Sequence, residues 1–188
     1  MLGQAIEEVL GNHFLTPSNS PFARGRTIRK GRSIISPPYE GGDKGEVLAY
    51  SRNDLDITDN SAVFAKITQL KPAVLINATG YTNVDGAETD KKTAFAVNAE
   101  AVQNIAEICA RINAVFFHFS TDYVFDGSQR HGYSEDDMDH IAPLNVYGES
   151  KLEGELRIKN QESRIKNKEW KYFIIRTSWL YGSGGKNF

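Results

Sequence analysis

Short continuous apolar runs alternate along the chain with longer stretches in which apolar positions recur at helical spacing. The runs predict strands over 47–50, 74–77, 115–120 and 172–177. The periodic stretches predict helices over 1–10, 58–70, 94–112 and 147–162. Continuous apolar strands separated by amphipathic helices are typical of a parallel sheet whose two faces are covered by helices. We therefore predict an α/β fold with a doubly wound parallel sheet.

Two of the predicted helices have a definite apolar face. The first starts at a capping residue, Thr58 or Asp59, and stops before Pro72. Its inward positions are Val63, Phe64, Ile67 and Leu70. The inward positions of the helix over 94–112 are Val102, Ile105, Ala106, Cys109 and Ile112.

The segment 11–45 interrupts this regular pattern. It contains four of the six prolines and a basic cluster between Arg24 and Arg32. A structureless segment of this length is uncommon inside a compact domain, so we interpret it as an insertion or a disordered loop. A hairpin over 27–35 is the structured alternative. The basic cluster is interpreted as a solvated loop in preference to a phosphate-binding patch.

Composition limits the classes of protein to which the chain can belong. With 188 residues, 40% hydrophobic and 24% charged, the chain fits a single domain over 1–188. A net charge of −2 gives no electrostatic case for a nucleic-acid or membrane partner. The lone cysteine excludes an internal disulfide, and no Cys/His cluster has metal-ligand spacing, so we expect a cytoplasmic protein without a metal site. No apolar run approaches the ~20 residues of a membrane span.

Polar or aromatic residues follow three of the predicted strands. Asn77, Thr121 and Trp179 each stand at or just after a strand end. The carboxyl ends of parallel strands meet at one edge of the sheet, where open α/β sheets bind their ligands. These three residues are therefore expected at one ligand-binding crevice.

Tyr147 and Lys151 are four residues apart at the start of a predicted helix and share one face of it. A phenol can give its proton to a carbonyl oxygen that gains charge as hydride arrives. A lysine one turn away favours the tyrosinate and so lowers the phenol's pKa of about 10. Thr121 would donate a second hydrogen bond to the same oxygen. The Tyr-x-x-x-Lys spacing alone also arises by chance on exposed helices.

The run from Ser120 to Gly127, followed by the run from Pro143 to Glu155, resembles the extended short-chain dehydrogenase/reductases. The specific resemblance is to the dTDP-4-dehydrorhamnose reductase family, and it covers 1–10 and about 46–188. It implies a Rossmann-like NAD(P)-binding domain. Supporting matches lie at 54–59, 72–78, 81–85, 96–100 and 176–182.

The resemblance also implies roles for individual residues. The catalytic group is Thr121, Tyr147 and Lys151. Substrate contacts are Thr121, Asp122 and Trp179. Cofactor contacts are Gly3, Arg52, Asp56, Ile57, Ala78, Thr79, Tyr81, Asn98, Tyr147 and Lys151. Two alternatives are that Trp179 is only a core aromatic and that Asn98 is only a helix cap.

Arg52, just after the strand predicted over 47–50 (the second strand of the family), favours NADPH over NADH because an arginine there suits the additional phosphate. An ordinary surface arginine is the alternative interpretation. Magnesium and a homodimer are suggested by family resemblance only.

The chain departs from the family at both ends. Of the family's first strand and glycine-rich turn only Gly3 is matched, and the C-terminal part that covers the substrate is not present after Phe188. We interpret the chain as truncated at both ends, with impaired cofactor binding and turnover. Loss of a central strand should also expose two strand edges.

The leading functional hypothesis is NAD(P)H-dependent reduction of the 4-keto group of a nucleotide sugar in dTDP-L-rhamnose biosynthesis. One alternative is a non-catalytic, reductase-like subunit that regulates a partner enzyme. Another is a nucleotide-sugar epimerase or dehydratase of the same extended type.

Overall fold

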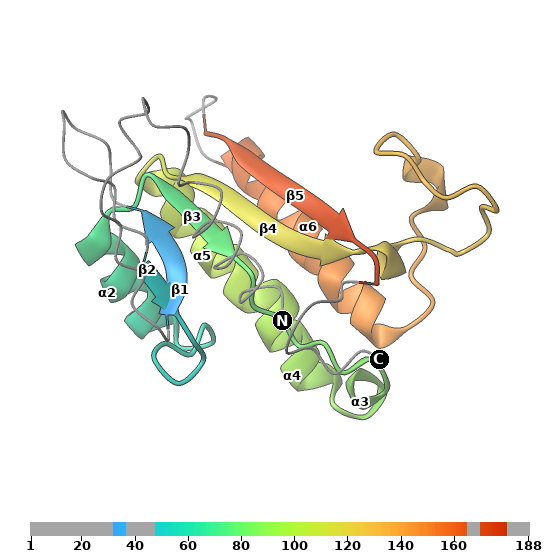
Figure 1. The fold of residues 1–188 in the computed structure, drawn as a ribbon, viewed down its shortest axis with the longest axis horizontal. Helices are drawn as coiled ribbons and strands as arrows, with labels where there is room; N and C mark the ends of the chain where they lie inside the picture. Colours follow the sequence, from blue (N-terminus) through green and yellow to red (C-terminus); the bar gives the residue numbers. More distant parts are fainter. Residues whose placement is uncertain (1–31, 37–47, 165–169, 180–188) are drawn as a thin grey trace, which may run out of the picture.

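The computed structural model describes residues 32–36, 48–164 and 170–179, which form one α/β layer structure (Figure 1). Its five strands make a single sheet in the order β2-β1-β3-β4-β5. Their bounds are β1 Arg32–Ser36, β2 Leu48–Tyr50, β3 Val74–Asn77, β4 Val115–Thr121 and β5 Tyr172–Thr177. The strands predicted over 74–77 and 172–177 are confirmed with the same bounds, and the other two within one residue.

Helices α2, α5 and α6 lie side by side along one face of this sheet (Figure 1). The bounds of the helices are α2 Asn60–Leu70, α3 Val84–Thr89, α4 Lys91–Phe95, α5 Ala101–Arg111 and α6 Val146–Arg164. Shorter elements are the π-helical turn η1 Ala96–Glu100 and the 3₁₀ turns η2 Asp122–Val124 and η3 Met138–His140. Within the described ranges, no helix is both long and apolar enough to cross a membrane.

Strands β3, β4 and β5 are parallel neighbours. Asn77 is in register with His118, and Thr121 with Thr177, so the strand ends predicted to carry chemistry do lie at one edge. The expected α/β class with a parallel sheet is therefore confirmed for this part of the chain.

Strand β1 is antiparallel to both of its neighbours. Ile35 is in register with Leu48 of β2 and with Leu75 of β3. The expectation of two exposed strand edges is therefore wrong, because β1 supplies the backbone partners that both edges need. The interpretation of 11–45 as wholly an insertion or loop is also wrong for Arg32–Ser36, whose central isoleucines favour extended backbone. Residues 27–31 of the alternative hairpin lie outside the described residues.

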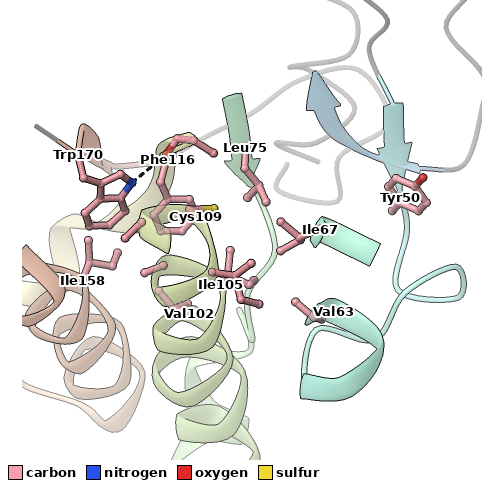
Figure 2. Packing of buried hydrophobic residues seen from close by; sticks show 14 residues of the cluster. Tyr50, Val63, Ile67, Leu75, Val102, Ile105, Cys109, Phe116, Ile158 and Trp170 are labelled. Carbon is pink, nitrogen blue, oxygen red and sulfur yellow. Dashed lines mark hydrogen bonds between the residues drawn. The ribbon is translucent and has the colours of Figure 1, made fainter. Parts of the chain in front are cut away.

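The core lies between the sheet and the three packed helices (Figure 2). Figure 2 shows side chains from α2, α5, β4 and α6 meeting there, among them Ile67, Ile105, Phe116 and Ile158. Trp170 closes one end, where its Nε1 donates a hydrogen bond to the carbonyl oxygen of Ala114 at 2.8 Å. Burial of these side chains fixes α5 and α6 against the parallel strands, and so fixes the residues that the two helices bring to the sheet edge.

The predicted helix over 58–70 is confirmed as α2. Its cap is Asp59, whose carboxylate accepts hydrogen bonds from the backbone N–H groups of Ser61 and Ala62 at 3.1 and 3.0 Å. The prediction that Phe64 points inward is wrong, because that side chain is 48% exposed. Phe64 directly follows the buried Val63. Because consecutive helical side chains point about 100° apart, Phe64 is turned away from the core.

The single helix predicted over 94–112 is instead α4, η1 and α5 in succession. Its expected inward residues in α5 are confirmed as buried, while Ile112, just after α5, is only partly buried. The π-helical turn places one additional residue in the helix. A pattern search with a regular 3.6-residue period does not predict that residue, and so it predicts a single helix.

Candidate active site

Thr121 and Tyr147 are brought together from separate elements. Thr121 is the last residue of β4, and Tyr147 lies in the first turn of α6. That helix starts here because Asn145 Oδ1 accepts a hydrogen bond from the backbone N–H of Gly148 at 2.8 Å. The Thr121 hydroxyl comes close enough to Tyr147 to lower the pKa of its phenol. The predicted pairing of a strand-end threonine with a helical tyrosine is thus present.

The Tyr147 hydroxyl has an environment that retains its proton. Burial raises the pKa of Tyr147, the adjacent Thr121 hydroxyl lowers it to a smaller extent, and Asp122 and Tyr123 raise it further. The Tyr123 ring meets the Tyr147 ring edge-on, with centroids 5.6 Å apart and planes at 76°. At neutral pH this side chain is therefore a protonated phenol that can act as a donor.

Lys151 is almost fully buried in the next turn of α6. Its Nζ donates a hydrogen bond to the carbonyl oxygen of Phe119 at 2.6 Å. Burial lowers the pKa of Lys151 to about 8, while the negative charge of Glu155 acts in the opposite direction. The prediction that Lys151 lowers the pKa of Tyr147 is wrong for this structure, because the pKa of Tyr147 is raised and the ammonium is bound by a backbone carbonyl.

The loop after β3 is shaped by two buried asparagines. Asn77 Oδ1 accepts hydrogen bonds from the backbone N–H and the hydroxyl of Thr79 at 3.1 and 2.6 Å. Asn98 Oδ1 accepts from the backbone N–H of Tyr81 at 2.9 Å, and Asn98 Nδ2 donates to the Tyr81 carbonyl at 3.1 Å. Both ends of the loop are therefore held by side-chain amides.

This loop, residues 78–81, lies directly beside Lys151. A Cβ added at Gly80 would lie 3.3 Å from Asn98 Oδ1 and 3.8 Å from Lys151 Nζ. The structure thus brings together Lys151 and the predicted cofactor loop with Ala78, Thr79 and Tyr81. A glycine lets the backbone approach this closely.

Asn98 also ties the loop to α6. Its Nδ2 donates to Ser150 Oγ at 2.9 Å, and Ser150 Oγ donates to the carbonyl oxygen of Tyr147 at 2.8 Å. Asn98 is buried inside η1, so the alternative of a helix cap is wrong. Its amide positions the loop and the tyrosine-bearing turn, while direct contact with a cofactor stays a prediction.

Asp122 connects the ends of β4 and β5. Its Oδ1 accepts a hydrogen bond from Thr121 Oγ1 at 3.2 Å, and its Oδ2 accepts one from Ser178 Oγ at 2.6 Å. Trp179 follows Ser178 with a left-handed φ of 48° and is 77% exposed. The alternative that Trp179 is a core aromatic is therefore wrong. Its indole lies on the surface, next to the residue that binds Asp122.

Arg52, Asp56 and Ile57 follow β2, whose carboxyl end lies at the same sheet edge because β1 is antiparallel to both neighbours. Arg52 Nε is 4.0 Å from Asp56 Oδ2, and both side chains are exposed. Asp56 accepts hydrogen bonds from the backbone N–H and hydroxyl of Thr58, which lower the pKa of its carboxyl. Ile57 packs against the core. Gly3 lies outside the described residues.

His118 and Ser120 were not among the predicted site residues. They occupy alternate positions of β4, and His118 is fully buried with its Nδ1 3.1 Å from Asn77 Nδ2. Burial and the charge of Lys151 hold the pKa of His118 well below its usual value, so the ring is neutral. Within the described part of the chain, His118 Nε2 and Ser120 Oγ have no hydrogen-bond partner. Two polar residues within the apolar run 115–120 are the signal that could have found them.

No group of three or more His, Cys, Asp or Glu side chains is placed to hold a metal ion in residues 32–36, 48–164 and 170–179. The expectation of magnesium therefore rests on family resemblance alone.

Comparison with known proteins fits this geometry. Residues 39–188 match the family described as the RmlD substrate binding domain. The chain belongs to this family. Over 158 residues it is 44% identical to the dTDP-4-dehydrorhamnose reductase of Aggregatibacter actinomycetemcomitans, which covers 84% of the chain and 50% of that relative. The chain spans about half the length of the curated relatives that it matches.

Solved structures lead to the same family. The crystal structure of dTDP-4-dehydrorhamnose reductase from Bacillus anthracis, in complex with NADP, has a TM-score of 0.66 and 40% identity, covering 74% of the chain and 46% of that structure. A UDP-Glc/GlcNAc 4-epimerase from Campylobacter jejuni has a TM-score of 0.60 at 23% identity, covering 69% and 38%, and this likeness shows the fold alone.

Proposed function

We propose that this RmlD-family chain carries the carbonyl-reducing site of a dTDP-4-dehydrorhamnose reductase. The observation that carries the proposal is the placement of Thr121, at the end of β4, next to Tyr147, in the first turn of α6, beside the buried Lys151. The substrate class follows from the relatives at 44% and 40% identity that are named dTDP-4-dehydrorhamnose reductase.

Tyr147 is the proton donor of the proposed reaction. Its raised pKa keeps the hydroxyl protonated at neutral pH. Negative charge that develops on the substrate's 4-keto oxygen is met by the Tyr147 O–H, and the proton passes to that oxygen. The Thr121 hydroxyl, next to Tyr147, is proposed to donate a second hydrogen bond to the same oxygen.

The residues at the sheet edge fit a nicotinamide dinucleotide, which supplies the hydride when bound. The nicotinamide end of the cofactor is proposed to bind beside Lys151, where the backbone at Gly80 approaches the ammonium closely. Arg52 and Asp56 after β2 fit the adenosine end, and the exposed guanidinium of Arg52 favours NADPH. The NADP bound to the Bacillus anthracis relative supports this choice.

Asp122 and Trp179 are proposed as substrate contacts. Trp179 offers an exposed ring at the end of β5 for stacking on a sugar or base. Ser178 links that segment to Asp122 and so to the catalytic threonine. A homodimer remains a proposal from the family alone.

The test is NADPH oxidation by the 188-residue chain with dTDP-4-dehydrorhamnose. We expect Tyr147→Phe to lower the rate by ~10²-fold or more, the size expected for loss of a general acid. Tyr172→Phe, at the start of β5 and so at the opposite end of that strand from Thr177, is the matched control and should leave the rate unchanged.

Two results would count against a reductase. Cofactor binding without turnover in the parent chain would favour the non-catalytic regulatory subunit. Conversion of the sugar without net NADPH consumption would favour the epimerase alternative.

A further inference from the structure

A buried ion pair lies one turn beyond the catalytic lysine. Glu155 of α6 is fully buried, and Arg176 of β5 binds it with both ends of its guanidinium. Arg176 Nε donates to Glu155 Oε1 at 3.0 Å, and Arg176 Nη2 donates to Oε2 at 2.7 Å. Arg176 also lies over the Phe125 ring, 4.8 Å from its centroid. The carboxylate is therefore held in a fixed place between helix and sheet.

Stability alone is a weak reason for such a pair. Removing two charges from water is costly, and apolar residues of similar volume often stabilise a protein as well or better. Glu155, however, has a second cationic neighbour. It follows Lys151 by four residues, so the two side chains share one face of α6, and both are buried.

The groups facing Lys151 come from several elements. His118 faces it from β4, Tyr147 and Glu155 lie on its own helix, and Tyr81 belongs to the adjacent loop after β3. The 3₁₀ turn η2 brings Asp122 and Tyr123 to Tyr147, and Arg176 of β5 is engaged by Glu155. Of these groups, Glu155 is the one whose charge raises the pKa of Lys151 against the effect of burial.

We propose that Glu155 is a positioning residue for Lys151. Clamped by Arg176, it holds a fixed negative charge one helical turn from the ammonium and keeps that ammonium protonated in a buried site. Its importance for carbonyl reduction rests on the function proposed above, but the charge coupling itself does not.

The test measures Lys151 directly, without turnover. The chain is labelled with ¹³C-lysine, the Lys151 signal is assigned from Lys151→Arg, and its Cε shift is followed with pH by NMR. We expect the Lys151 titration midpoint to fall in Glu155→Gln and to return towards the parent value in Glu155→Asp, which keeps the charge. Glu153→Gln is the matched control, because Glu153 is on the same helix, partly exposed, and paired with Arg157 at 2.7 Å. Its midpoint should equal that of the parent chain.

A second variant covers the case in which Glu155→Gln does not fold. Glu155→Met combined with Arg176→Met removes both charges and keeps the volume. We expect the Lys151 midpoint to fall here too, but by less than in Glu155→Gln, because the positive charge of Arg176 is removed as well. A folded Glu155→Gln or double variant that titrates like the parent chain overturns the proposal. Because no substrate or cofactor is needed, a chain that lacks reductase activity can still show the coupling.

If the chain is an active reductase, the alkaline limb of its kcat/KM profile should move to lower pH in Glu155→Gln. A purely structural role for Glu155 would lower stability and leave that limb in place.

Discussion

The α-carbon of Gly154 in α6 faces the carbonyl oxygen of Asn98 in η1 with no room for a side chain between them. A Cβ at this position would overlap a backbone oxygen, which cannot rotate away as a flexible side chain can. Alanine is the better helix former by about 1 kcal/mol, but forcing a methyl group into a close-packed contact typically costs about 1–3 kcal/mol.

We therefore expect Gly154→Ala to lower the free energy of unfolding, measured by urea denaturation. Glu153→Ala, at the adjacent and partly exposed position, should change it by less than about 1 kcal/mol. A Gly154→Ala chain as stable as its parent would contradict the close contact.

Removal of the Thr121 hydroxyl should change both the titration of Tyr147 and the rate of carbonyl reduction. The adjacent Thr121 hydroxyl lowers the pKa of Tyr147, so Thr121→Val should move the Tyr147 titration to higher pH. The ultraviolet absorbance of tyrosinate, compared with Tyr147→Phe, measures this shift. In an active chain the same change should cost about 10²-fold in kcat, and Thr121→Ser should retain most of the rate. An unchanged tyrosine titration would show that the two hydroxyls are not coupled.

Cofactor choice should depend on Arg52. Its guanidinium is exposed at the end of β2, where the additional phosphate of NADPH would be bound. We expect Arg52→Ala to weaken NADPH binding by about 10-fold or more and NADH binding far less, since a charge-assisted hydrogen bond contributes about 1.5–3 kcal/mol. Nicotinamide fluorescence titrations measure both. Equal weakening for the two cofactors would mean that Arg52 does not contact the phosphate.

The loop between Phe125 and Ile141 should be sensitive to acid through Asp126. This carboxylate accepts hydrogen bonds from Tyr133 Oη at 2.6 Å, from the backbone and hydroxyl of Ser128, and from His140 Nδ1 at 3.1 Å. These contacts, that of Tyr133 foremost, hold the pKa of Asp126 well below its ordinary value. Because the folded-state pKa is the lower one, the stabilisation is present above the unfolded pKa of about 3.9 and is lost as pH falls below it.

Asp126→Asn should therefore be less stable than the parent chain at neutral pH, and the difference in Tm should shrink as the pH falls below about 4. Asp136→Asn, in the same loop, is the control and should stay close to the parent throughout. A Tm difference for Asp126→Asn that does not vary with pH would contradict a role for the ionised carboxylate.

Much of the fold could be predicted from local pattern. The strand ends at Asn77 and Thr121 followed from continuous apolar runs, and the cap at Asp59 from its place before an amphipathic helix. The pairing of Thr121 with Tyr147 followed from the needs of carbonyl reduction and from the resemblance to the extended short-chain dehydrogenase/reductases. These features depend on short stretches of sequence and on general rules of α/β sheets.

Other features depend on contacts between distant segments. The direction of β1 is set by its two sheet neighbours and not by its five residues. The hydrogen bond of Lys151 to the Phe119 carbonyl depends on the depth at which α6 packs on β4. The contact of His118 is with Asn77, 41 residues earlier in the chain, and its neutral state depends on burial and on the charge of Lys151 from α6. No periodicity in a single segment contains this information.

The π-helical turn at Ala96–Glu100 has a consequence for insertions and deletions. Each helical residue turns the chain by about 100°, so the additional residue of this turn sets the relative rotation of the segments before and after it. Deleting one residue here would restore an ordinary α-helix, yet it would rotate Lys91–Phe95 against Ala101–Arg111 and withdraw Asn98 from the loop and from Ser150. The irregular turn therefore sets the rotation between the two parts of one continuous helical segment. As a result, α5 packs in the core while Asn98 faces the loop of the site.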